Sequence, residues 1–104
     1  MTNEKTKRGN MNLKNEIAKT GYTIVKFYAD WCAPCKMMAP ILEKVAKRDG
    51  VTLISINADK FPDLTQEYDV QSLPTLIFCK DGEIINKQVG TMNEQMIIKH
   101  LESL

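Results

Sequence analysis

Residues 22–46 read YTIVKFYADWCAPCKMMAPILEKVA, and the pattern of the sequence changes at the two cysteines. The first eight of these residues form a nearly continuous apolar run, which is typical of a strand buried on both faces of a sheet. After Cys32 the apolar residues recur at helical spacing, and Gly50 is placed to stop that helix. Cys32 and Cys35 therefore lie at a strand-to-helix junction, on the first turn of the helix.

Predicted strands and helices also alternate in the rest of the chain. Further helices are predicted at 13–19, 59–68 and 92–104, and further strands at 51–56, 75–79 and 84–89. Asp81-Gly82 between the last two strands signals a hairpin, and Asn93 is a candidate N-cap of the last helix. Alternating strands and helices that end in a hairpin and a helix predict an α/β fold, a mixed sheet with helices on both faces.

Composition narrows the class of protein. The chain has 104 residues, of which 43% are hydrophobic and 26% charged, as expected for one globular domain over residues 1–104. A net charge of +1 gives no field that would attract nucleic acid or an anionic membrane. We also expect the protein to be a monomer. No apolar stretch suits a signal peptide or a membrane span, which predicts a cytoplasmic location. The polar residues 1–10 are expected to be disordered or frayed.

The spacing of Cys32 and Cys35 favours redox chemistry. Cysteines at i and i+3 on the first helical turn share a face, so their sulfurs can form and break a disulfide with little backbone movement. The helix N-terminus favours negative charge, and Cys32, expected to be the more exposed, is the predicted nucleophile. Its thiolate attacks a partner's disulfide, and Cys35 then releases the reduced partner. Pro34 fits the first turn and stiffens the loop.

The cysteines allow two other interpretations. The pair could be half of a zinc site, but only Cys79 and His100 remain as further sulfur or imidazole ligands. Cys79 ends an apolar strand and is interpreted as a small core residue, and His100 as a solvated side chain on the last helix. A binding module without redox turnover is the alternative function, although such a module does not need both cysteines.

Residues 27–40 resemble the active-site segment of the thioredoxin family. The similarity continues through 72–75, 80–83 and 89–90, and so covers the chain from about Tyr22 to the C-terminus. The resemblance implies the thioredoxin fold and a thiol–disulfide oxidoreductase that reduces disulfide-containing proteins. It further implies that a separate flavin-dependent thioredoxin reductase recharges the dithiol with NADPH. We expect the chain itself to hold no cofactor or metal.

The same resemblance assigns further site residues. It implies that Pro74 is cis and faces the cysteines, and that a groove for an extended substrate segment is bordered by Trp31, Leu73, Pro74 and Gly90, with Ala33 and Pro34 between the cysteines. Ala33 departs from the common motif, which has glycine there. The N-terminal segment is short and poor in β-branched residues, so the family's first edge strand is expected to be missing or minimal.

Lys26 is the most unusual departure, because thioredoxins usually hold a buried aspartate there and a lysine at the position of Ser55. Alternation along the strand places Lys26 on the sheet face of Ile24 and Tyr28. The resemblance to thioredoxins implies that this position lies beneath the helix that carries the cysteines. Three interpretations stay open. The ammonium can extend to water past a buried stem, remain near the sulfurs as a cation, or lose its charge and accept a proton from Cys35. Lys26 is therefore included among the candidate catalytic residues.

Overall fold

A computed structural model describes residues 4–6 and 12–104, and it contains one five-stranded sheet. The strands are β1 (Glu4–Thr6), β2 (Tyr22–Tyr28), β3 (Val51–Asn57), β4 (Thr75–Lys80) and β5 (Glu83–Val89). The helices are α1 (Leu13–Glu16), α2 (Ala33–Ala46), α3 (Pro62–Glu67) and α4 (Glu94–Glu102).

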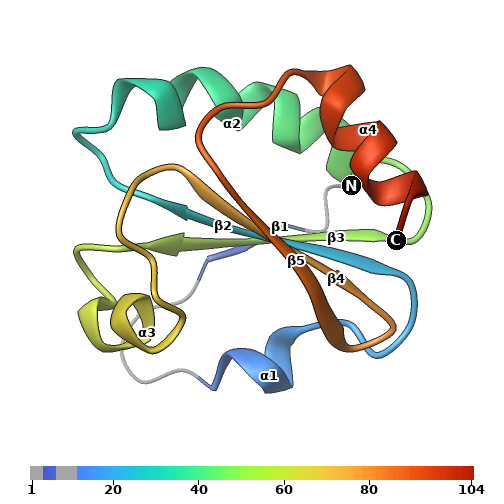
Figure 1. The fold of residues 1–104 in the computed structure, drawn as a ribbon, viewed down its shortest axis with the longest axis horizontal. Coiled ribbons are helices and arrows are strands. Elements are labelled where there is room, and N and C mark those ends of the chain that lie inside the picture. Colours follow the sequence, from blue (N-terminus) through green and yellow to red (C-terminus); the bar gives the residue numbers. More distant parts are fainter. Residues whose placement is uncertain (1–3, 7–11) are drawn as a thin grey trace.

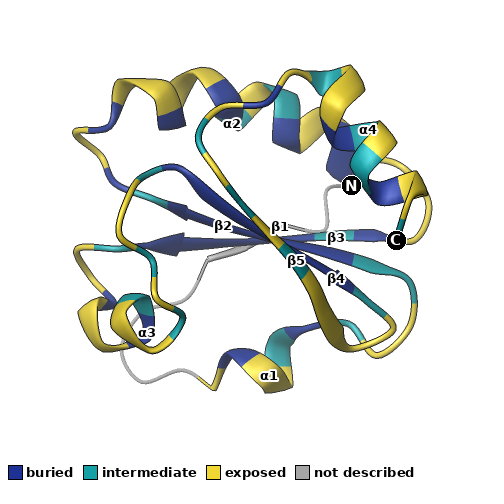
Figure 2. Ribbon diagram, viewed as in Figure 1, coloured by how far each residue is buried: buried dark blue, intermediate teal, exposed yellow. Residues whose placement is uncertain are grey.

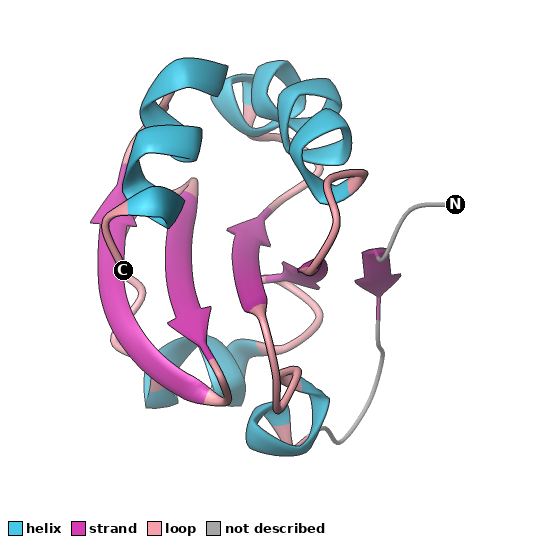
Figure 3. Ribbon diagram, turned by 90° about the vertical axis from the view of Figure 1, so that its right-hand side faces the viewer, coloured by secondary structure: helices cyan, strands magenta, loops and turns pink. Residues whose placement is uncertain are grey.

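The sheet is mixed, as predicted. Its strand order is β1-β3-β2-β4-β5, in which β1, β3 and β2 run parallel while β4 and β5 are antiparallel to their neighbours. Helices α2 and α4 cover one face of the sheet, and α1 and α3 cover the other (Figures 1 and 3). The predicted α/β architecture with helices on both faces is confirmed.

Two apolar layers hold the helices to the sheet, and the central strands contribute to both (Figure 2). Ile24 packs with Leu42 in the layer under α2 and α4, whereas Val25 and Phe27 belong to the layer over α1 and α3. This alternation explains the continuous apolar run of β2, because both of its faces are covered. Each fully buried side chain of this size contributes roughly 1.5–3 kcal/mol to the free energy of unfolding.

The local signals of the sequence mostly have their expected structural form. Asp81 and Gly82 both have positive φ, which is the conformation of a two-residue hairpin turn between β4 and β5. Asn93 caps α4, since its side chain accepts a hydrogen bond from the Met96 N–H at 2.9 Å. Helix α1 is shorter than predicted because Ile17 already has an extended backbone, with ψ 129°.

The N-terminal segment differs from the expectation of disorder. Residues 4–6 form β1, which pairs in parallel with β3, so that expectation is wrong for these three residues. The first edge strand is thus present and minimal. Residues 1–3 and 7–11 lie outside the described part of the chain.

None of the helices in the described ranges is both long and apolar enough to cross a membrane.

Candidate active site

The site lies where the parallel strands β2 and β3 end. Both strands have their carboxyl ends at the same edge of the sheet, and the Ala58 N–H donates to the Tyr28 carbonyl at 2.7 Å. The loops that follow are thereby held side by side, as in other sheets whose parallel strands carry functional loops at this edge. One loop leads to Cys32 and the other to Asp59 and α3.

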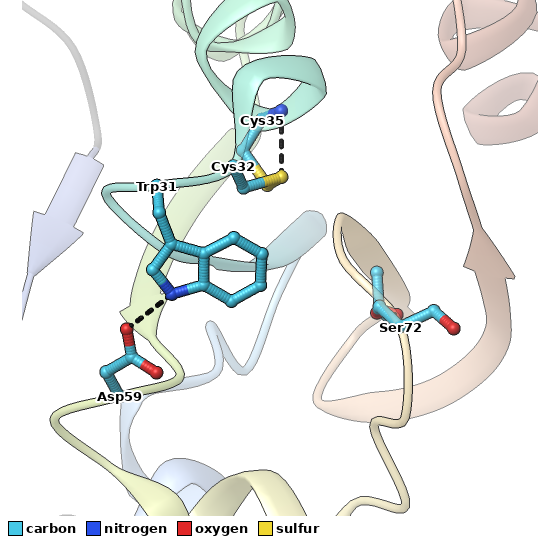
Figure 4. Close-up of a disulfide and its surroundings, with 6 residues drawn as sticks. Trp31, Cys32, Cys35, Asp59 and Ser72 are labelled. Atoms are coloured by element: carbon cyan, nitrogen blue, oxygen red, sulfur yellow. Dashed lines mark hydrogen bonds between the residues drawn. A yellow bond between two sulfur atoms is a disulfide. The ribbon is translucent and has the colours of Figure 1, made fainter.

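Cys32 and Cys35 form a disulfide at the start of α2, with their Cα atoms 5.3 Å apart. Cys32 is the N-cap residue of the helix, and its sulfur accepts a hydrogen bond from the Cys35 N–H at 3.2 Å (Figure 4). A sulfur at this position lies in the positive field of the helix N-terminus and accepts a hydrogen bond from one of the N–H groups that have no partner within the helix. The arrangement stabilises a thiolate on Cys32 when the disulfide is reduced.

The expected difference in exposure between the two cysteines is absent in this disulfide form. Cys32 is 4% and Cys35 3% exposed, and both belong to a small apolar cluster with Ala29, against which Leu73 packs. Cys32 is therefore not the clearly more exposed cysteine in this disulfide form, and its greater exposure in the reduced protein stays a prediction. What distinguishes Cys32 is its N-cap position.

Trp31 stands beside the disulfide with 70% of its surface exposed, which is unusual for so large an apolar side chain. Its Nε1–H donates to the Asp59 carboxylate at 2.8 Å, which fixes the orientation of the indole (Figure 4). Asp59 is not among the site residues predicted from the sequence. The available signal was its position directly after a buried parallel strand, at the edge of the sheet where the cysteines also lie.

A pocket of about 640 Å³ begins at Trp31 and extends along α3. Its lining combines the predicted residues Trp31 and Leu73 with Asp59, Ser72 and several residues that were not predicted, namely Ala58, Pro62, Thr65, Gln66, Asp69, Val70 and Gln71. Leu73 contacts both this pocket and the cluster around the disulfide. The pocket therefore lies next to the cluster that contains the disulfide.

The other residues of the expected groove lie around the same end of the fold. The Leu73–Pro74 peptide bond is cis, as the resemblance implies, and the buried Pro74 accepts a hydrogen bond from the Gly90 N–H at 2.9 Å through its carbonyl. Ala33 and Pro34 are exposed on the first turn of α2. Contact of these residues with a substrate stays a prediction.

Lys26 lies on the sheet face beneath α2, as alternation and the resemblance to thioredoxins together imply. It is 5% exposed, too little for an ammonium extended into bulk water, so the interpretation as a snorkelling lysine is not supported. Lys26 lines a pocket of about 260 Å³ together with Cys35 and Ser55. A buried lysine and the second cysteine therefore border one cavity.

Cys79 and His100 do not join the disulfide in a metal site. In residues 4–6 and 12–104, no group of three or more His, Cys, Asp or Glu side chains is placed to hold a metal ion. Cys79 is fully buried in the layer over α1 and α3, as predicted. His100 is half-buried with its ring centroid 4.6 Å from that of Phe78, so the prediction of a solvated side chain is wrong. Its position on α4 turns it toward the sheet.

The three cysteines should differ sharply in reactivity once the disulfide is reduced. Burial raises the pKa of the Cys79 thiol to about 11, so only about one Cys79 in ten thousand is ionised at pH 7. We expect iodoacetamide to label Cys32 first and Cys79 only after unfolding, as followed by peptide mass spectrometry. Equal labelling of Cys32 and Cys35, or rapid native labelling of Cys79, would contradict these assignments.

A mixed sheet with a disulfide at the N-terminus of its first long helix, beside an exposed tryptophan, defines a protein built for dithiol–disulfide exchange. The thioredoxin family model matches residues 4–103, and the chain belongs to the thioredoxin family. It is 38% identical over 89 residues to the thioredoxin of Chlamydia trachomatis, covering 85% of this chain and 86% of that protein. It is 44% identical over 75 residues to mitochondrial thioredoxin-2 of Schizosaccharomyces pombe, covering 71% of this chain and 56% of that protein.

The solved structures lead to the same family. A mutant thioredoxin from Halobacterium salinarum has a TM-score of 0.87 and 30% identity, with 96% of this chain and 88% of that chain covered. The predicted thioredoxin fold is confirmed, and the chain is a thiol–disulfide oxidoreductase. The alternative of a binding module without redox turnover is not favoured.

Proposed function

We propose that this thiol–disulfide oxidoreductase works as a reductant of disulfide-containing proteins in the cytoplasm, recharged from NADPH by a separate thioredoxin reductase. The observation that carries the proposal is the position of Cys32, whose sulfur is half of a disulfide while the residue is the N-cap of α2. A thiolate stabilised there is available to attack at neutral pH. A reducing compartment keeps such a pair in the dithiol form that this role requires.

In the proposed cycle, the Cys32 thiolate attacks one sulfur of the partner's disulfide. A bond forms between Cys32 and that sulfur, and the partner's other sulfur leaves as a thiolate and takes up a proton. Cys35, as a thiolate, then attacks Cys32, so that the Cys32–Cys35 bond forms and the bond to the partner breaks. The partner gains two electrons and two protons, and the reductase returns two electrons to the Cys32–Cys35 disulfide.

Partner segments are proposed to bind across Trp31 and Leu73, in the pocket that adjoins the disulfide cluster. The indole is held by Asp59 while most of its surface remains exposed, which gives the partner a rigid apolar contact. Pro74, Gly90, Ala33 and Pro34 are proposed to complete the contact surface. No metal or bound cofactor takes part in the proposed cycle.

Insulin reduction tests the proposal. The purified protein should accelerate insulin reduction by dithiothreitol, followed as turbidity, and should couple insulin reduction to NADPH consumption when a bacterial thioredoxin reductase is added. Cys32→Ser is the matched control and should abolish both signals. Activity with dithiothreitol but not with several reductases would contradict the proposed electron source, whereas inactivity in both assays would contradict the reductant role. Cell fractionation with an antibody tests the cytoplasmic location.

A further inference from the structure

We propose that Lys26 is an electrostatic positioning residue for Cys35, whose buried ammonium favours the step that releases the reduced partner. The inference rests on the proposed function and assigns one step of that cycle to a residue outside the Cys32–Cys35 loop. Cys35, and not Cys32, is the cysteine that borders the pocket of Lys26.

The position of Lys26 in the sheet places its side chain under the start of α2. Lys26 is in the middle of β2, where it pairs with Ser55 of β3 and Leu76 of β4. Its neighbour two residues earlier, Ile24, packs in the layer beneath α2, and alternation turns Lys26 to the same face. The pocket beside it is bounded from the helix side by Cys35 and Ala39. Strand and helix thus hold the amine and the second sulfur at one cavity.

The surroundings suit a positive charge on this side chain. The Lys26 Nζ lies 5.1 Å from the centroid of the Tyr28 ring, within the range of a cation–π interaction, which is stronger when the cation is desolvated. Two other charged residues, Asp30 and Lys36, line the pocket, and both are exposed. Water screens the charges of these two exposed residues more strongly than it screens a buried charge.

The release step is the one that such a charge affects. In the mixed disulfide, Cys32 is bonded to the partner and Cys35 carries the remaining thiol. The Cys35 thiol must lose its proton to solvent, and its thiolate then attacks Cys32 while the partner's sulfur departs with the electron pair. A buried cation at the Cys35 side of the pocket stabilises the negative charge that this step requires. The first attack, by Cys32, depends mainly on the helix N-terminus.

A single-turnover reaction with Ellman's reagent separates the two steps. The reduced protein releases one thionitrobenzoate when Cys32 forms the mixed disulfide and a second one when Cys35 resolves it, both followed at 412 nm by stopped flow. For Lys26→Met we expect the second phase to slow about tenfold at pH 7, and its pH midpoint to move up by about one pH unit. The first phase should change by less than about threefold, since the charge acts at Cys35.

Lys36→Met is the matched control, because it removes a lysine that lines the same pocket but is exposed. Both phases should stay within about twofold of the wild type, since solvent screens this charge. Lys26→Gln, which keeps a polar side chain, guards against misfolding of the methionine variant and should show the same slow second phase. An unchanged second phase in the folded Lys26 variants, or equal slowing in Lys36→Met, overturns the proposal. The reagent replaces partner and reductase, so this result is independent of the insulin assay.

Discussion

Replacing Cys35 by serine should turn the protein into a trap that stays covalently bound to the proteins it attacks. Cys32 remains at the N-cap of α2 and still forms the mixed disulfide, but serine cannot complete the exchange. Insulin reduction coupled to NADPH through the reductase should fall by at least about a thousandfold, as expected when one of two cooperating groups is removed. After incubation with a disulfide-containing protein, non-reducing electrophoresis should show covalent adducts that dithiothreitol cleaves.

Two double variants show which cysteine forms the bond to the trapped partner. Cys32→Ser combined with Cys35→Ser should give no adduct, because the attacking sulfur is gone. Cys79→Ser combined with Cys35→Ser should trap as much as Cys35→Ser alone, since Cys79 is buried on the other side of the sheet from α2. Adducts that survive the loss of Cys32, or that require Cys79, would show that another sulfur is the nucleophile.

The sequence was sufficient for those features that depend on local patterns. The period of apolar residues changes from strand to helix at Cys32, and this places the cysteines at the end of β2 and the start of α2. The Asp81-Gly82 hairpin follows from turn chemistry that few other residues satisfy. The orientation of Lys26 to the same sheet face as Ile24 follows from alternation along a strand. These signals lie within one element or between two adjacent ones.

Features that depend on contacts distant in sequence could not be predicted in this way. Asp59 and Trp31 are 28 residues apart, and only the parallel pairing of β2 and β3 brings their loops together. The orientation of His100 depends on how α4 is rotated over Phe78, which the charged neighbours of His100 do not reveal. The packing of Leu73 against the cluster that contains both cysteines likewise joins residues about 40 positions apart in the chain.

Replacing Gly21 by alanine should cost the protein about 3 kcal/mol of unfolding free energy, as strain and overpacking together. Gly21 has φ +80°, which side-chain-bearing residues rarely adopt, and a Cβ there would lie 2.6 Å from the Gly50 carbonyl oxygen. That oxygen accepts the Tyr22 N–H at 2.7 Å where β2 and β3 begin to pair, so it cannot move freely. Gly21 also forms two hydrogen bonds with Asp81 in the β4–β5 hairpin. Its N–H donates to the Asp81 carboxylate, and its carbonyl accepts from the Asp81 N–H, so the Gly21 backbone is held in place. Urea unfolding followed by circular dichroism measures the loss.

Gly50→Ala is the control that separates strain from collision. Gly50 has a similar φ of +77°, but a Cβ at this position meets no atom of the described residues within 4 Å. We therefore expect Gly50→Ala to lower the unfolding free energy only by the cost of the left-handed conformation, about 1–2 kcal/mol. The difference between the two variants measures the collision with the backbone at the start of the β2–β3 pair. Equal losses in Gly21→Ala and Gly50→Ala would mean that this contact relaxes without cost and that φ alone requires glycine at both positions.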